Sequence, residues 1–199
     1  MSTPNARDEI LRAVRAALPP TVIAPARPYQ REQPYASRAD LVTQFSRESV
    51  ASGALVLTCD GDPIPHAVQG AANAREVLSL LPGVASTVAT TLDARAFTTL
   101  ELFICEASVG VAENGALWMA TSDPHHRAAM FLAERVIIVV SAGVIVPDLH
   151  EAYRRINVRA TSFGTFVAGP SKTADIEQAL VIGAHGPKEL TVIISETQA

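Results

Sequence analysis

Cysteine is scarce in this chain of 199 residues, with only Cys59 and Cys105 present, each inside an apolar run. Two isolated thiols supply neither a disulfide framework nor a four-thiolate cluster, so we expect both to be buried core residues. Charge is also sparse: 18% of residues are charged, the net charge is −4, and no dominant basic patch stands out. Nucleic acid is therefore not an expected partner.

Long apolar runs are missing as well. None reaches the roughly 18 residues that a membrane-spanning helix needs, so we expect no membrane span. The N-terminus carries charges from Arg7 to Arg15 without an apolar block, which is not the pattern of a secretory signal. We therefore expect a cytoplasmic protein.

Several motifs that would define a reaction are absent. There is no HExxH, no CxxC and no His/Cys cluster, so no dedicated metal site is expected. No GxGxxG follows a strand, and Pro170 stands where a Walker A loop needs lysine. A Ser-His-Asp set could be drawn from Ser171, His185 and Asp175, but the GxSxG turn that would support it is lacking.

What the chain does have is apolar content, at 48%, in segments that alternate between strand and helix patterns. This alternation predicts an α/β layer structure with a largely parallel sheet. The expected helices are 3–18, 37–53, 66–81, 123–134 and 147–156. The expected strands are 54–59, 84–90, 102–105, two short ones within 106–119, then 136–140, 163–168 and 190–195. The most apolar of these, Val136 to Val140, is typical of a strand buried on both faces.

The N-terminal part differs from the rest. After the first helix, five prolines between Pro19 and Pro34 predict an extended arm. A single amphipathic helix of this length is marginally stable alone. We therefore expect it to pack on its own domain or on a partner subunit, which allows a homo-oligomer.

A polar stretch between the last two expected strands is the main candidate for a site. It runs from Gly169 through Ser171, Lys172 and Thr173 to Glu177, and it closes with His185-Gly186-Pro187-Lys188. Ser171 or Thr173 could cap a short helix opening at Ala174, whose N–H groups and the Lys172 charge would attract an anion. Plain helix capping, with Asp175 and Glu177 complementing the dipole, is the alternative.

A second candidate is Glu113-Asn114-Gly115. Glu113 could act in a site, as the nucleophilic glutamate of class I CoA transferases does in a similar Glu-Asn-Gly. Alternatively, Asn114-Gly115 forms a tight turn and Glu113 is a solvated strand-end residue. Trp118 is expected in the core, and His125-His126 at a solvated helix end.

The segments Gly169-Pro-Ser-Lys-Thr-Ala-Asp-Ile-Glu177 and Gly183-Ala-His-Gly-Pro187 resemble the signature of the lactate-utilisation protein C family, the LUD domain. Glu113-Asn114-Gly115 matches a further family position, and the resemblance covers about residues 54–195. It implies the three-layer α/β/α fold, with a mainly parallel sheet, shared by ribose-5-phosphate isomerase and CoA transferases. The expected domains are an N-terminal helix and arm, 1–36, and a LUD domain, 37–199.

The resemblance also implies a function. It points to a component of an L-lactate oxidation system, in which companion proteins carry the iron–sulfur clusters and this chain binds no cofactor. The chain would bind a small organic acid or dock on those companions, and it could be a subunit of an L-lactate dehydrogenase complex. A stand-alone CoA-transferase-like or phosphosugar-type enzyme is the alternative.

The site residues expected on this basis fall into two groups. Those expected to orient the substrate or transfer protons are Glu113, Asp175 and His185. Those expected to bind the substrate are Asn114, Gly115, Gly169, Ser171, Lys172, Thr173, Glu177 and Gly186. We expect the two segments to form one pocket beyond the carboxyl ends of the strands.

Overall fold

The computed structural model describes residues 5–17, 37–89, 94–173 and 181–196, and the chain divides into two compact units, 1–34 and 35–199. The first unit contains helix α1 (Ala6–Ala17), in which no residue is buried. The helices of the second unit are α2 (Arg38–Ala51), α3 (Ile64–Ala71), η1 (Ala94–Thr99), α4 (Pro124–Leu132), η2 (Ala142–Val144) and α5 (Leu149–Arg155).

The described strands of the second unit form three sheets. They are β1 (Leu55–Cys59), β2 (Val77–Ser79), β3 (Leu102–Glu106), β4 (Val109–Val111), β5 (Ala116–Thr121), β6 (Arg135–Ser141), β7 (Ile145–Val146), β8 (Phe163–Val167), β9 (Lys172–Thr173), β10 (Val181–Ile182) and β11 (Glu189–Ser195). The central sheet has the order β1-β11-β6-β3-β2, and every pair in it is parallel. The expected α/β class with a mainly parallel sheet is therefore confirmed.

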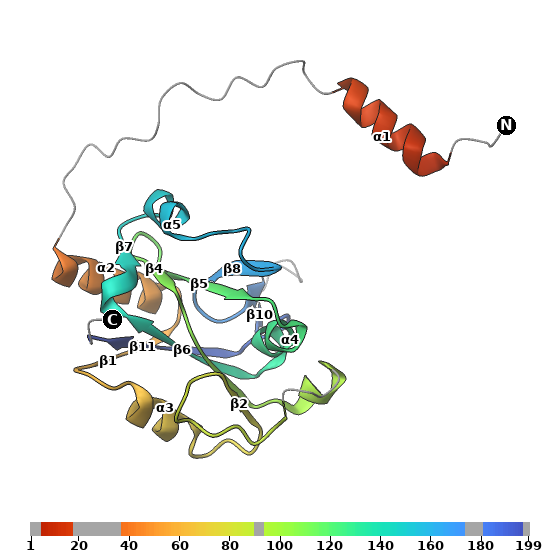
Figure 1. The fold of residues 1–199 in the computed structure, drawn as a ribbon. Coiled ribbons are helices and arrows are strands. Elements are labelled where there is room, and N and C mark those ends of the chain that lie inside the picture. The colour runs from red at the N-terminus through yellow and green to blue at the C-terminus, as the bar shows by residue number, and fades with distance from the viewer. Residues whose placement is uncertain (1–4, 18–36, 90–93, 174–180, 197–199) are drawn as a thin grey trace. The chain divides into compact units, whose positions relative to one another are not determined.

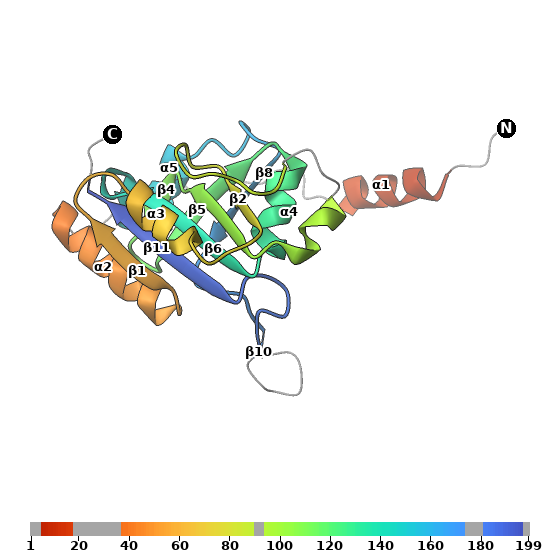
Figure 2. The ribbon, with the colours of Figure 1, turned by 90° about the horizontal axis from the view of Figure 1, so that it is seen from below.

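The core is layered around strand β6, as Figures 1 and 2 show. Its five central residues are buried, because neighbours cover both faces of the sheet. On one face, Ile137 and Val139 pack with residues of α3. On the other, Ile138 and Val140 pack with residues of α2, α4 and β5.

A second sheet, of order β7-β4-β5-β8, packs on the face of the central sheet that carries Ile138 and Val140. Its β5 pairs antiparallel with both β4 and β8, whereas β4 and β7 are parallel. Trp118 on β5 lies in a small core with α5 and packs against Phe166, with 4.8 Å between ring centroids. The expected core position of Trp118 is confirmed. Both cysteines are buried and free, as expected.

Helix starts follow the sequence signals closely. Ser37 and Asp40 form a reciprocal capping box at α2, and the side chains of Asp123 and Asp148 accept from the first turns of α4 and α5. Side-chain oxygens at these positions satisfy N–H groups that have no partner within the helix, which fixes where each helix begins.

The region of residues 66–90 differs from expectation. The expected helix 66–81 ends at Ala71, and Val77–Ser79 is instead edge strand β2 beside β3. Burial of Val77 and Leu78 against the sheet outweighs their helix-compatible spacing. The expected strand 84–90 is irregular as far as it is described, because the hydroxyls of Ser86 and Thr87 accept from the N–H groups of Ser79 and Val77.

Strand β1 corresponds to the expected strand 54–59. It is an edge of the central sheet: among the described strands it pairs with β11 alone, and Leu55 is 60% exposed. The short helix expected at Ala174 lies outside the described residues.

The turns at Gly115 and Gly169 pack closely against the C-terminal end of α2. Gly115 and Gly169 both have positive φ, +67° and +69°, which glycine adopts without strain. A Cβ at Gly115 would lie 2.5 Å from the Ser49 nitrogen, and one at Gly169 would lie 2.0 Å from the Ser52 oxygen. The backbone of α2 therefore leaves no room for a side chain at either position.

We predict that Gly115→Ala and Gly169→Ala each lower the free energy of unfolding by about 2 to 4 kcal/mol, through left-handed strain plus a backbone clash. Urea denaturation would measure this. Gly61→Ala is the control, because Gly61 also has positive φ, +107°, but a Cβ there meets nothing within 4 Å. Equal losses for all three variants would show that close packing on α2 contributes nothing.

Candidate functional site

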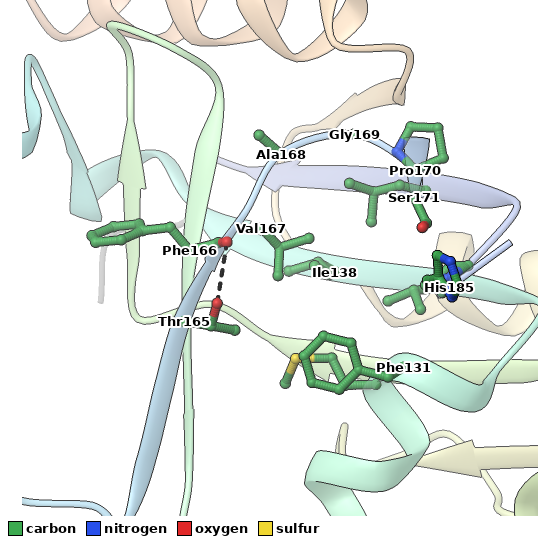
Figure 3. A pocket seen from close by; sticks show the side chains of 15 residues that line it. Phe131, Ile138, Thr165, Phe166, Val167, Ala168, Gly169, Pro170, Ser171 and His185 are labelled. Carbon is green, nitrogen blue, oxygen red and sulfur yellow. Dashed lines mark hydrogen bonds between the residues drawn. The ribbon is translucent and has the colours of Figure 1, made fainter. Parts of the chain in front are cut away.

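A cavity of about 230 Å³ lies between α4, β8 and the segment that leads into β11. Figure 3 shows it from close by. Its lining residues are Met130, Phe131, Val136, Ile138, Thr165, Phe166, Val167, Ala168, Gly169, Pro170, Ser171, His185, Gly186, Pro187 and Leu190. Both segments that resemble the family signature therefore contribute to one cavity.

Backbone hydrogen bonds hold those two segments together. The Ser171 N–H donates to the Pro187 oxygen at 2.8 Å, and the Ser171 oxygen accepts from the Gly183 N–H at 2.9 Å. Strands β9 and β10 extend this pairing as an antiparallel ladder. The position of Ser171 is thus fixed from both sides of its peptide backbone.

The polar end of the cavity is formed by Ser171 and His185, which lie near each other in Figure 3. A Cβ at Gly186 would lie only 3.0 Å from the Ser171 Cβ, so this glycine lets the two segments approach. Hydroxyl and imidazole groups can donate to or accept from a small polar ligand. His185 is exposed, so solvent reaches this end.

The remaining walls are mostly apolar. Met130, Val136, Ile138 and Leu190 are buried, and Phe131 is 44% exposed at the edge. Of the lining residues, only His185 has a side chain that can carry a positive charge. The cavity therefore combines an apolar interior with one hydroxyl-imidazole end, which suits a small amphipathic molecule.

Lys172 has a different environment from the one expected. Its Nζ donates to the Ser52 oxygen at the C-terminal end of α2. A lysine there satisfies a free carbonyl and complements the negative end of the helix dipole. Lys172 and Thr173 are not among the lining residues, so anion binding by either stays a prediction. Asp175 and Glu177 lie outside the described residues.

The Glu113 turn does not join this cavity. The Glu113 carboxylate accepts from the Leu149 N–H at 3.2 Å, at the first residue of α5, and Asn114 Oδ1 accepts from the Ala116 N–H. Gly115 rests on Ser49 of α2. The structure thus does not form the single pocket that we expected, and a chemical role for these three residues stays a prediction.

The position relative to the central sheet also differs. Gly169 follows the carboxyl end of β8, but β8 belongs to the second sheet. The central strands β6 and β11 contribute Val136 and Leu190 from their amino ends. The cavity therefore lies opposite the edge where open α/β sheets usually bind ligands.

Sequence reasoning missed the apolar walls and Thr165. Met130 and Phe131 come from the end of α4, and contact between α4 and the 169–187 segment is long-range, so no local pattern reveals it. Thr165 gave the one usable signal, as a hydroxyl within an otherwise apolar strand. Its hydroxyl donates only a long hydrogen bond, 3.4 Å, to the Phe166 oxygen.

The start of α4 is organised by Asp123. Its Oδ1 accepts from the His125 N–H at 2.7 Å and lies 3.1 Å from His125 Nδ1, while Oδ2 is 3.6 Å from His126 Nε2. The backbone hydrogen bond, with the histidines beside it, holds the pKa of Asp123 below its usual range. The two histidines thus serve the helix end, which positions α4 beside the cavity.

The five-stranded parallel sheet, with helices packed on it, defines an α/β domain. Comparison with known protein families identifies the family: residues 69–195 match the model of the LUD domain. The chain belongs to that family. A crystal structure of a DUF162 family protein from Deinococcus radiodurans has the same fold, with a TM-score of 0.62 and 21% identity over 81% of this chain and 99% of that one.

Curated relatives cover a shorter stretch. "Lactate utilization protein C" from Geobacillus kaustophilus is 31% identical over 97 residues, 46% of this chain and 40% of the relative. "Lactate utilization protein C 1" from Bacillus mycoides is 33% identical over 104 residues, 49% of this chain and 44% of the relative. The match therefore spans less than half the length of these relatives.

Two further observations bear on the described part of the chain. It contains no group of three or more His, Cys, Asp or Glu residues placed to hold a metal ion. None of its helices is long and apolar enough to cross a bilayer.

We predict that Asp123→Ala destabilises the domain, because α4 loses its N-cap. A carboxyl whose pKa is lowered on folding adds stability above its unfolded pKa, near 4, and loses that part as pH falls through the folded pKa. The difference in melting temperature between the wild type and the variant should therefore become smaller at acidic pH. A gap that stays constant from neutral pH to about pH 2 would contradict this.

Proposed function

We propose that this chain serves lactate utilisation by binding a small 2-hydroxy or 2-oxo acid, such as lactate or pyruvate, in the Ser171–His185 cavity. The observation that carries the proposal is that both family-signature segments converge on this one cavity. The names of the curated relatives supply the metabolic context.

The chemistry of the cavity suits such a ligand. Lactate and pyruvate carry a methyl group at one end and a carboxylate at the other. The apolar wall formed by Ile138 and Leu190 can take the methyl group, and the Ser171 hydroxyl and His185 imidazole can bind the carboxylate. A volume of about 230 Å³ is below the roughly 300–1,000 Å³ of sites for drug-sized ligands, which favours a small metabolite.

We also propose that helix α1 docks on the iron–sulfur companion proteins of such a system. Within its own unit, Ile10 and Val14, one turn apart, are 63% and 53% exposed, so they form an apolar stripe along α1. An amphipathic helix of this length gains most of its stability by packing that stripe on another surface. Ile10→Asp with Val14→Asp should abolish co-purification with the companions, whereas Ala16→Asp, on the opposite face, should not. Retained co-purification of the double variant would end this part of the proposal.

For the cavity, we predict that L-lactate or pyruvate raises the melting temperature, and that Ser171→Ala and His185→Gln each weaken binding about tenfold. The loss corresponds to one hydrogen bond to a charged group, about 1.5 kcal/mol. At about 100 times its dissociation constant, a true ligand should stabilise the fold by roughly 2.7 kcal/mol. Calorimetric titration would give the affinities.

Two controls sharpen the test. His150→Gln changes a histidine that is not a lining residue and should leave binding unchanged. Lys172→Gln distinguishes an anion-binding role of Lys172 from a structural one. Because Lys172 contacts the Ser52 oxygen, the variant should lower the stability of the domain and preserve its affinity for the acid. Loss of binding in Lys172→Gln with full binding in His185→Gln would place the acid outside this cavity.

A further inference from the structure

A second cavity, of about 400 Å³, opens on the opposite face of the central sheet. It exists because α3 has only eight residues and covers part of that face. Residues of β1, β11, β6 and β3 form its floor. The apolar lining residues are Leu55, Leu57, Leu102, Val136, Ile137 and Ile193.

Polar groups converge on this floor from three elements. His66 and Gln69 come from α3, and Arg135, Glu189 and Thr191 come from the sheet. The His66 Nδ1 is buried and makes no hydrogen bond within the described chain. A buried nitrogen of this kind costs free energy unless a ligand or water satisfies it.

Two opposite charges lie next to each other in this cavity, and the Arg135 charge also acts on the nearby Glu101 carboxylate. Arg135 and Glu189 are register partners on neighbouring strands and point to the same face. Among the described residues no salt bridge within 4.0 Å joins them, although Lys188 and Glu134 form one beside them. Arg135 is half-buried, and its guanidinium can bind a carboxylate through two hydrogen bonds.

We infer that this cavity binds an apolar α-amino acid of about the size of leucine. Arg135 binds its carboxylate, Glu189 binds its ammonium group, and the leucine and isoleucine floor takes its side chain. His66 Nδ1 supplies a further hydrogen bond to one of the charged groups. A zwitterion matches a cavity lined by one cation and one anion, whereas a simple acid would leave Glu189 beside a like charge.

The test is calorimetric titration of the full chain with L-leucine, 4-methylpentanoate, which lacks the amine, and 3-methylbutylamine, which lacks the carboxylate. L-Leucine should bind, and each analogue should bind at least about tenfold more weakly. Arg135→Gln and Glu189→Gln should each weaken leucine binding by about tenfold. Glu189→Gln should also remove the preference for leucine over 4-methylpentanoate.

The variants include their own controls. Glu189 is exposed, so Glu189→Gln tests the site even if Arg135→Gln destabilises the sheet. Arg47→Gln, at an exposed pair with Glu48, and His185→Gln, in the other cavity, should bind leucine as wild type does. Absence of leucine binding, or equal affinity for leucine and 4-methylpentanoate, would overturn the inference and leave water as the partner of His66.

Discussion

The turns at Gly115 and Gly169 both depend on the C-terminal end of α2. Gly115 approaches it at Ser49 and Gly169 approaches it at Ser52. Lys172 adds a hydrogen bond to the Ser52 oxygen. A helix end normally leaves carbonyls without partners, and here the Lys172 ammonium group donates to one of them, that of Ser52. The resulting contacts fix the path of the chain from β8 into the cavity.

This arrangement changes how the recognisable motifs are understood. Glu113-Asn114-Gly115 and Gly169-Pro170-Ser171-Lys172 suggest chemistry when considered as strings. In the structure, most of their members have defined structural contacts: Gly115, Gly169 and Lys172 at the end of α2, and Glu113 at the start of α5. Ser171 instead has its backbone fixed on both sides while the residue lines a cavity, which is the arrangement expected of a binding residue.

Local signals predicted the parts of the fold that local physics decides. The buried strand at Val136–Val140 and the helix starts at Ser37 and Asp123 are all as expected. The prediction of a helix through Val77 was wrong because strand pairing with β3, and not the spacing of apolar residues, determines the conformation of this segment. The second sheet was not foreseen as a unit, since β5 and β8 pair across a long stretch of sequence. The polar end of the cavity was predictable because a local motif forms it, whereas its apolar walls were not, because long-range packing brings them together.

Both cavities lie toward the amino ends of β6 and β11, one on each face of the sheet, and Val136 borders both. The carboxyl ends of β1 and β11 are occupied by the chain itself. Ser195 Oγ donates to the Gly61 oxygen at 2.7 Å, and the Glu196 N–H donates to the Cys59 oxygen. Those bonds satisfy backbone groups that a ligand would otherwise meet at the usual edge. Incomplete helical cover at the opposite edge leaves space there, and the two cavities occupy that space.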